Sequence, residues 1–517
     1  MTAPQTVLHA AERRGSRLDR WWGDRSERTR RVVRWAAPAG VVALAAAARL
    51  WNLGHPDVLV FDETFYVKDA WTLSQNGYES SWTGDADAAF NAGDVNGFTD
   101  EPSFVVHPPL GKWLIALGML AFGPNPFGWR IAVAVVGVLA VVLLMTIAQR
   151  LTGSRLLATI AGFLFAISGN AIVMSRVSLL DSFLMFFALL GAGAVLLDRE
   201  QSAARLALWR SRHSSDWGPA LWFRPWLVAA GAAFGAAAAV KWNGLYFLAA
   251  FAVYTLVVDA VARRRAGIPF WFTGTVLKQA PVSFLLTVPA AITVYLASWT
   301  GWFVTDGGYD RDWAQQPGNA WTGALSWVPL PLQSLWHFET SVYAYHVGEN
   351  RPHPYQANPL TWLLMVRPTS MFYESVDDGA AGQSIAGIAN PIVWWASVAA
   401  AAYLFYRLIR RREWRVGFVL LGLGAGYLPW LLYLNRTVFQ FYTIAFEPYL
   451  LLALTLCIGM LLGSPEDDRW RRTNGLATVG VFLGVALLVS IYFYPLWTGI
   501  TADYWFIASH WWLPSWR

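Results

Sequence analysis

Long apolar stretches separated by short basic segments form the main pattern of this 517-residue chain. Runs such as VVALAAAA, IAVAVVGVLAVVLLMTIA and FLLTVPAAITVYLA contain no charged residue. They approach or reach the roughly 20 residues that a helix needs to cross a hydrocarbon core about 30 Å thick. The pattern predicts an all-α polytopic membrane protein. About eleven transmembrane helices are expected, near residues 35–53, 128–149, 155–174, 178–197, 226–241, 244–262, 280–298, 388–406, 416–434, 440–462 and 475–495.

Charged residues are distributed asymmetrically along this pattern. The tail at 1–34 contains nine arginines, and further arginines gather at 198–225, 263–278, 407–415 and 469–472. If the N-terminus is cytoplasmic and the spans alternate, all of these segments lie inside, as the positive-inside rule expects. Membrane topology therefore explains the net charge of +6, and no nucleic-acid partner is expected.

Two long segments, 54–127 and 299–387, interrupt the apolar pattern. The first holds ten acidic residues and two lysines, and the second is rich in Trp, Tyr, Pro and Gly. The same alternation places both outside the membrane, together with the C-terminus. Loops this long are usually functional. We expect a cytoplasmic tail at 1–34 and one membrane domain at 35–517 that carries both loops.

The first loop contains two short helical patterns. One runs from about Thr64 to Gln75 and is followed by Asn76-Gly77, a good helix stop. The other runs through GKWLIALGML, which is too short for a span and suits a helix lying along the membrane. The single cysteine, Cys457, excludes an intrachain disulfide and a cysteine zinc site.

Two adjacent acids, Asp62 and Glu63, follow the first span in VLVFDETFYVKDAW. Adjacent side chains on a regular element point in different directions, so different roles are expected for them. One can act as a general base on a hydroxyl, and the other can orient an acceptor or balance nearby cations. The alternative is that both simply cap the helix that begins near Thr64.

Four cations lie at the expected outer ends of spans: Arg130, Arg176 (close to Asp181), Lys241 and Arg436. A charge within a span costs about 2.5–3.5 kcal/mol on insertion scales, so each is a functional hypothesis. Snorkelling to lipid phosphates explains any one of them equally well. Four cations on one face, beside two acids, indicate a site for an anionic lipid headgroup.

A third cluster lies in ENRPHPYQANPLTWLLMVRP, residues 349–368. His353 and Tyr355 can hydrogen-bond a sugar or a phosphate, and Trp362 can stack on a sugar ring. The alternative is that these residues only order a proline-rich loop.

The sequence resembles the protein O-mannosyltransferase family, and most closely its actinobacterial form. The resemblance covers most of the membrane region. It depends on seven motifs in the family's order: FDETFY at 61–66, HPPLGK at 107–112, GWR at 128–130, SRVSLLDSFLMFF at 175–187, KWNGLYF at 241–247, HPYQANPLTW at 353–362 and RTVFQFY at 436–442. It implies the GT-C glycosyltransferase fold, with an active site that faces the extracytoplasmic loops. Residues 299–387 are too few to contain the MIR domain of eukaryotic members.

The resemblance also implies a reaction and a partner. Mannose would pass, with inversion, from polyprenyl-phosphate mannose to Ser or Thr hydroxyls of secreted or membrane proteins, beside the Sec translocon at the plasma membrane. Asp62 is the expected base, and Glu63 supports it or positions the peptide. The expected donor-binding residues are Arg130, Arg176, Lys241, Arg436, His353 and Tyr355, and those that position acceptor or sugar are Tyr66, His107, Asp181, Asn243 and Trp362.

No metal or other cofactor is expected, because Arg and Lys can neutralise a lipid monophosphate leaving group. Two alternatives stay open. One is another GT-C transferase that moves a sugar from a polyprenyl carrier to a glycan or lipid. The other is a transporter of lipid-linked sugars, although the unusual charges here gather on one face rather than in the middle of spans.

Overall fold

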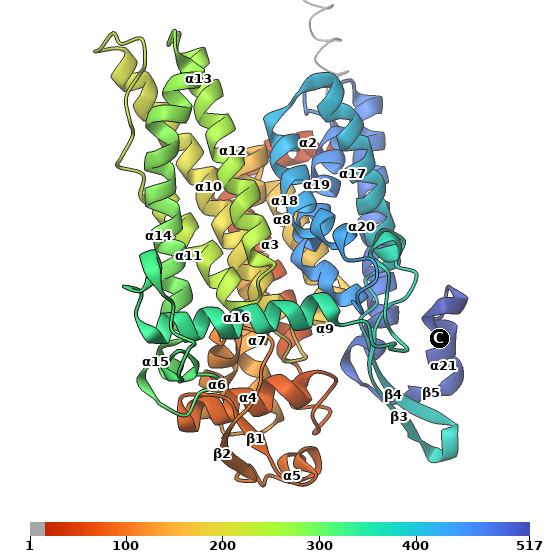
Figure 1. Ribbon diagram of the computed structural model, residues 1–517. Coiled ribbons are helices and arrows are strands. Elements are labelled where there is room, and N and C mark those ends of the chain that lie inside the picture. Colours follow the sequence, from red (N-terminus) through yellow and green to blue (C-terminus); the bar gives the residue numbers. More distant parts are fainter. Residues whose placement is uncertain (1–15) are drawn as a thin grey trace, which may run out of the picture.

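The computed structural model describes residues 16–517, and helices make up most of it (Figure 1). A helix lies at each of the eleven positions where a span is expected. Eight of the described helices are long and apolar enough to cross a membrane: α3 (Glu27–Leu50), α7 (Pro126–Thr152), α10 (Asp181–Arg210), α12 (Gly244–Arg265), the continuous run of α13 (Trp271–Gly274), η1 (Thr275–Gln279) and α14 (Ala280–Ser298), α17 (Pro391–Arg411), α18 (Trp414–Tyr427) with η6 (Leu428–Leu432), and α20 (Arg469–Thr498).

Three helices at the remaining expected positions are shorter than a full span, so the count of eleven is not confirmed. They are α8 (Arg155–Ala166), α11 (Pro225–Val240) and α19 (Glu447–Leu462). After α8 the chain resumes as α9 (Gly169–Val173), where a Cβ on Gly169 would lie 2.1 Å from the Trp497 ring. Only glycine allows that close approach, so the helix is interrupted where another element packs against its backbone.

Small residues allow α11 to pack closely inside the bundle. A Cβ on Gly231 would lie 2.3 Å from the carbonyl oxygen of Thr287 in α14, and one on Gly191 of α10 would lie 2.6 Å from the Phe234 ring in α11. A helix that is apolar all round is buried by its neighbours, and small residues bring membrane helices into contact. This packing fixes the end of α11, where Lys241 follows.

The two ends of the bundle differ in kind (Figure 1). The end that carries α2 (Arg17–Gly23) and α13 also carries the arginine-rich connections, and we call it the basic end. The opposite end carries segments 54–127 and 299–387, and we call it the loop end. The sequence predicts this separation of the basic connections from the long loops.

The first long loop folds into helices and a strand pair at the loop end. The expected helices are present as α4 (Glu63–Asn76) and α6 (Leu110–Phe122). Gly77 ends α4 in the left-handed conformation, with φ of 82°, and its N–H donates to the carbonyl of Leu73. Between the helices lie β1 (Ser80–Trp82), α5 (Ala86–Asn91) and β2 (Phe98–Pro102), and the two strands pair antiparallel.

The second long loop begins with α15 (Thr300–Val304) and continues into α16 (Leu330–Gly348), which lies across the loop end in Figure 1. It then forms the antiparallel hairpin of β3 (Ser370–Val376) and β4 (Ala381–Ala386). β5 (Ala502–Asp503), which precedes α21 (Tyr504–Ser509), pairs with β4. The sequence predicts no strands, so these short strand pairs are a difference from the all-α prediction, although the fold is mostly helical.

Candidate active site

Glu63, the first residue of α4, forms a buried ion pair with Arg130 of α7. Arg130 Nε lies 2.9 Å from Oε1 of Glu63 and Nη2 lies 2.8 Å from Oε2. The same carboxylate accepts the N–H groups of Val60 at 2.9 Å and Ser178 at 2.7 Å. A carboxylate has about four acceptor positions, and four donors occupy those of Glu63. The contacts fit a residue that positions the loop rather than one that accepts a substrate proton.

Arg130 and Arg176 hold the chain between α3 and α4. Arg130 also donates to the carbonyls of Pro56 at 2.6 Å and Val58 at 2.8 Å. Arg176 donates to the carbonyl of Trp51 at 2.7 Å, and to those of Arg49 and Asn52. The last carbonyl groups of a helix have no hydrogen-bond donor within the helix, and at the end of α3 Arg176 provides the missing donors. Both arginines were expected to bind the donor phosphate. The structure does not support that role, because main-chain and carboxylate oxygens already engage their guanidinium groups.

Asp62 immediately precedes α4, but its side chain makes no capping hydrogen bond. Asp62 therefore occupies the N-cap position, as the capping interpretation expects, but its carboxylate does not cap the helix by a hydrogen bond. Phe61, just before it, has a φ of 51°, a strained value for a bulky residue, and its ring packs edge-to-face against His353, Phe439 and Phe441. These aromatic contacts fix the backbone next to Asp62 and so help to position its side chain.

The charge environment of Asp62 suits a base. Burial raises the pKa of its carboxyl to about 6, with Lys241 lowering it and Asp181 raising it. A carboxyl with a pKa near 6 is ionised at neutral pH and is a stronger base than an ordinary aspartate.

Next to Lys241 lies a cavity of about 260 Å³. Lys241 follows the end of α11, and its Nζ lies 2.7 Å from Oδ2 of Asp181, the first residue of α10. Nζ also lies 5.1 Å from the centroid of the Tyr442 ring. The cavity is lined by His107, Asp181, Lys241, Trp242, Asn243, Leu245, Tyr246, Tyr343, His346, Val347, Pro429, Trp430, Tyr433, Arg436 and Tyr442. Five residues proposed from the sequence therefore meet here: His107, Asp181, Lys241, Asn243 and Arg436.

Arg436 is held at the cavity by His346, a residue that no sequence motif marks. Its Nη2 lies 2.8 Å from Nδ1 of His346, whose Nε2 lies 2.7 Å from the carbonyl oxygen of Val106. Burial and the neighbouring Arg436 lower the pKa of His346 to about 4. The neutral ring therefore donates through Nε2 and accepts through Nδ1. His346 also stacks on His107, with 5.2 Å between ring centroids.

One donor of Arg436 has no partner among the described residues. Its Nε is buried without a hydrogen bond. Buried donors are normally satisfied, so an orphaned guanidinium nitrogen beside a cavity favours an anionic ligand there.

The other expected site residues lie around this cavity rather than in it. Tyr66 is buried, with its ring centroid 5.9 Å from Nζ of Lys241 and 5.9 Å from the His107 ring. His353 and Tyr355 do not line the cavity: His353 packs against Phe61, and the N–H of Tyr355 donates to Nδ1 of His353.

Trp362 was expected to stack on a sugar, and the structure does not support that contact. Its side chain is fully buried, and its Nε1 donates to the carbonyl of Ala357. Its ring packs against Trp430 and Tyr442, which do line the cavity. Trp362 therefore packs behind two residues of the cavity wall and does not line the cavity.

Within residues 16–517, no group of three or more His, Cys, Asp and Glu side chains is arranged to hold a metal ion. The site offers two cations on one cavity, Lys241 and Arg436. Asp62 does not line this cavity, but it is close enough to Lys241 and Asp181 for their charges to act on its pKa. Such an arrangement can stabilise a departing phosphate while a carboxylate accepts a proton.

Comparison with known proteins identifies the family. Residues 40–297 match the family model described as dolichyl-phosphate-mannose-protein mannosyltransferase, and residues 331–516 match the C-terminal four TMM region of protein-O-mannosyltransferase. The polyprenol-phosphate-mannose–protein mannosyltransferase of Mycolicibacterium smegmatis is 35% identical, over 94% of both chains. The protein of that name from Corynebacterium glutamicum is 31% identical, over 89% of this chain and 88% of its own.

The fold also has a solved counterpart. The structure of the Saccharomyces cerevisiae protein O-mannosyltransferase Pmt1-Pmt2 complex bound to the sugar donor superposes with a TM-score of 0.71. The superposition covers 94% of this chain and 92% of the yeast chain, at 15% sequence identity, which establishes a shared fold. Two family models that together span most of the chain, and relatives above 30% identity along nearly its whole length, agree with the motifs. The chain belongs to the protein O-mannosyltransferase family.

Proposed function

We propose that this protein transfers mannose, with inversion, from polyprenyl-phosphate mannose to Ser or Thr hydroxyls of secreted or membrane proteins. The single observation that carries the proposal is the cavity that joins Lys241 and Arg436, whose residues Lys241 and Asp181 are coupled by charge to Asp62. The relatives named above supply the donor and acceptor classes by their names.

The chemistry assigns a role to each group. The acceptor hydroxyl oxygen forms a bond to the sugar carbon as the bond from that carbon to the phosphate oxygen breaks. Asp62 accepts the hydroxyl proton. Lys241 and Arg436 balance the charge that develops on the phosphate, and preorganised donors of this kind usually contribute most of such catalysis. Lys241 keeps two N–H groups for the phosphate, because Asp181 accepts one of its three.

The other residues act through these. Glu63, Arg130 and Arg176 hold the loop that presents Asp62, and His346 orients Arg436. Asn243 and His107 line the cavity and are placed to contact the sugar or the phosphate. We propose that no metal takes part, with the two cations supplying the positive charge that a metal would provide.

The proposed setting is the plasma membrane. With the basic end in the cytoplasm, as the positive-inside rule favours, the cavity opens on the extracytoplasmic side. There it would meet unfolded chains as they leave the Sec translocon, before their hydroxyl groups are buried.

The test is transfer of radiolabelled mannose by the purified, lipid-reconstituted protein. Polyprenyl-phosphate mannose is supplied with a Thr-rich peptide, and a matched peptide with every Thr and Ser replaced by Ala is the control. Label in the first peptide alone is the expected result. Label that enters only an added glycan or lipid acceptor would identify another GT-C transferase. Movement of intact donor across the vesicle membrane without transfer of mannose would identify a transporter.

A further inference from the structure

A second, larger cavity lies at the basic end of the bundle, away from the candidate active site. It has a volume of about 690 Å³ and lies between α10 and α12 on one side and α17 and α18 on the other. We call it the basic groove. Its apolar wall includes Val253, Val257 and Val261 of α12, and its charged residues include Arg199, Arg265 and Arg412.

The basic groove has an apolar part and a positively charged part, as a site for a lipid with an anionic headgroup would. The lining of α12 extends from Val253 to Arg265, about 18 Å at 1.5 Å per residue. Val253 and Val257 are more than half exposed in this apolar stretch, and Arg265 closes α12 at the basic end. The apolar stretch is therefore suited to an acyl chain, and the arginines to an anionic headgroup.

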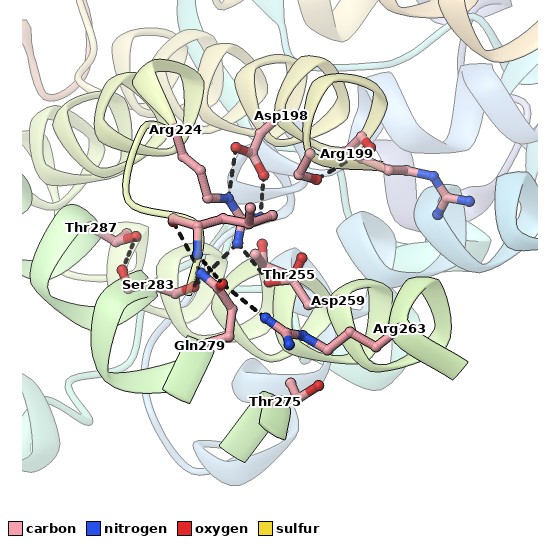
Figure 2. A network of polar contacts seen from close by, with 12 residues as sticks. Asp198, Arg199, Arg224, Thr255, Asp259, Arg263, Thr275, Gln279, Ser283 and Thr287 are labelled. Carbon is pink, nitrogen blue, oxygen red and sulfur yellow. Dashed lines mark hydrogen bonds and ion pairs between the residues drawn. The ribbon is translucent and has the colours of Figure 1, made fainter. Parts of the chain in front are cut away.

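The positive charge of the basic groove is not neutralised inside the protein. Asp198, next to Arg199 in sequence, instead pairs with Arg224, with 3.0 Å from Nε to Oδ1 and 2.5 Å from Nη2 to Oδ2. Asp259 of α12 also pairs with Arg224, at 2.6 Å. Figure 2 shows both acids directed into this network, whereas Arg199 extends away from it.

The remaining acids nearby are also engaged. Glu413 lines the groove but pairs with Arg407 at 2.7 Å, and Glu200 pairs with Arg150 at 2.8 Å. Among residues 16–517, no carboxylate forms an ion pair with Arg199, Arg265 or Arg412. The three arginines therefore present uncompensated charge at the mouth of an apolar groove.

Arg199 is also held in place for a ligand. Its guanidinium lies 3.7 Å from the centroid of the Trp414 ring, and its Nη1 donates to Tyr254 Oη at 2.9 Å. Arg263 and Gln279 extend the neighbouring network, with Nη2 of Arg263 3.2 Å from Oε1 of Gln279 (Figure 2). This network ties α10, α12 and the η1–α14 run together, so the wall that carries Arg199 is firmly positioned.

We propose that the basic groove binds one anionic phospholipid of the leaflet at the basic end, with its phosphate among Arg199, Arg265 and Arg412. Basic pockets between membrane helices on the cytoplasmic side recognise such headgroups, and each arginine near an anionic lipid contributes about fivefold in affinity. The proposal needs neither the mannose donor nor the transfer reaction, so it stands apart from the proposed function.

The test is native mass spectrometry of the full chain, delipidated in detergent and titrated with phosphatidylglycerol or with phosphatidylcholine of the same acyl chains. One phosphatidylglycerol should bind with clear preference over phosphatidylcholine. The double variant Arg199→Gln/Arg412→Gln should lose about 25-fold in phosphatidylglycerol affinity, at fivefold for each arginine. The matched double variant Arg264→Gln/Arg411→Gln removes two charges from the same end but none from the groove, and should bind as the unmodified protein does.

Three results would overturn the proposal: no preference for phosphatidylglycerol, equal losses in the two double variants, or displacement of the bound lipid by millimolar glycerol phosphate. Equal losses would show a general surface charge effect. Displacement by the soluble headgroup would show a site for free phosphate esters rather than for a lipid. If Arg199→Gln lowers the melting temperature in lipid-free detergent, Arg265→Gln replaces it in the double variant, because Arg265 is exposed and makes no ion pair among the described residues.

Discussion

Lys241 and Asp181 meet at the wall of the candidate active site, with Nζ 2.7 Å from Oδ2, although 60 residues separate them in the sequence. The pair joins the end of α11 to the start of α10. Both side chains are almost fully buried, so each charge is balanced mainly by the other. Lys241 therefore has a fixed position from which two further N–H groups can reach a phosphate.

Replacing Lys241 by Met should weaken binding of polyprenyl-phosphate mannose by about 2–5 kcal/mol, the usual loss when one partner of a buried charged contact is removed. Isothermal titration with the donor measures it. Lys68→Met is the control, because Lys68 pairs with Asp87 elsewhere in the first loop. Unchanged donor affinity in Lys241→Met would remove this residue from the phosphate site. The variant Lys241→Met/Asp181→Asn should recover stability but not affinity, because it leaves no unpaired buried charge.

Asp62→Asn should abolish mannose transfer while donor binding stays nearly intact, because the amide keeps the shape of the side chain but cannot accept the proton. Turnover and donor affinity are measured on the same preparation. Asp57→Asn changes an exposed acid five residues earlier and should leave both quantities unchanged. Near-normal turnover in Asp62→Asn would show that another group is the base.

The transfer rate should fall as the pH drops through about 6, because the base must be ionised and the pKa of Asp62 is raised to about 6. Lys241 lowers that pKa, so the acidic limb of the profile should move to higher pH in Lys241→Met. The measurement is the pH profile of turnover at saturating donor. An acidic limb that does not move would separate Asp62 from the influence of Lys241.

Glu63→Gln and Arg130→Ala should each destabilise the protein by about 3–5 kcal/mol, because each leaves a buried charge without its partner. Thermal melting in detergent measures this loss. Arg150→Ala breaks the exposed pair with Glu200 and should change stability by less than about 1 kcal/mol. If Glu63→Gln melts normally but transfers no mannose, Glu63 takes a direct part in the chemistry.

The hydrophobic pattern predicts the positions of the helices and the separation of the basic end from the loop end. It also brings Asp62, Lys241 and Arg436 to one region. It does not distinguish Arg436 from Arg130 or Arg176, because all three follow or precede apolar runs in the same way. The difference comes from the path of the main chain between Trp51 and Val58. Its carbonyl groups accept hydrogen bonds from Arg130 and Arg176 but not from Arg436.

Other features depend on contacts between distant segments. His346 lies in a Tyr-rich helix with no motif to mark it, and its role follows from Val106 and Arg436, 240 and 90 residues away. Trp362 is part of a family motif, yet only the packing of Trp430 and Tyr442 shows that its ring is enclosed. The pairing of β5 with β4 likewise joins segments that local sequence does not connect.

The contact between Glu63 and the N–H of Ser178 has a consequence for biosynthesis. The two residues are 115 positions apart, so a growing chain cannot complete the surroundings of Asp62 until α7 and the segment after α9 have entered the bilayer. Arg436 joins later still, when most of the polypeptide has left the ribosome. A chain that ends before Arg436 therefore lacks one of the two cations of the candidate site, so the site can be complete only after α18 has been made.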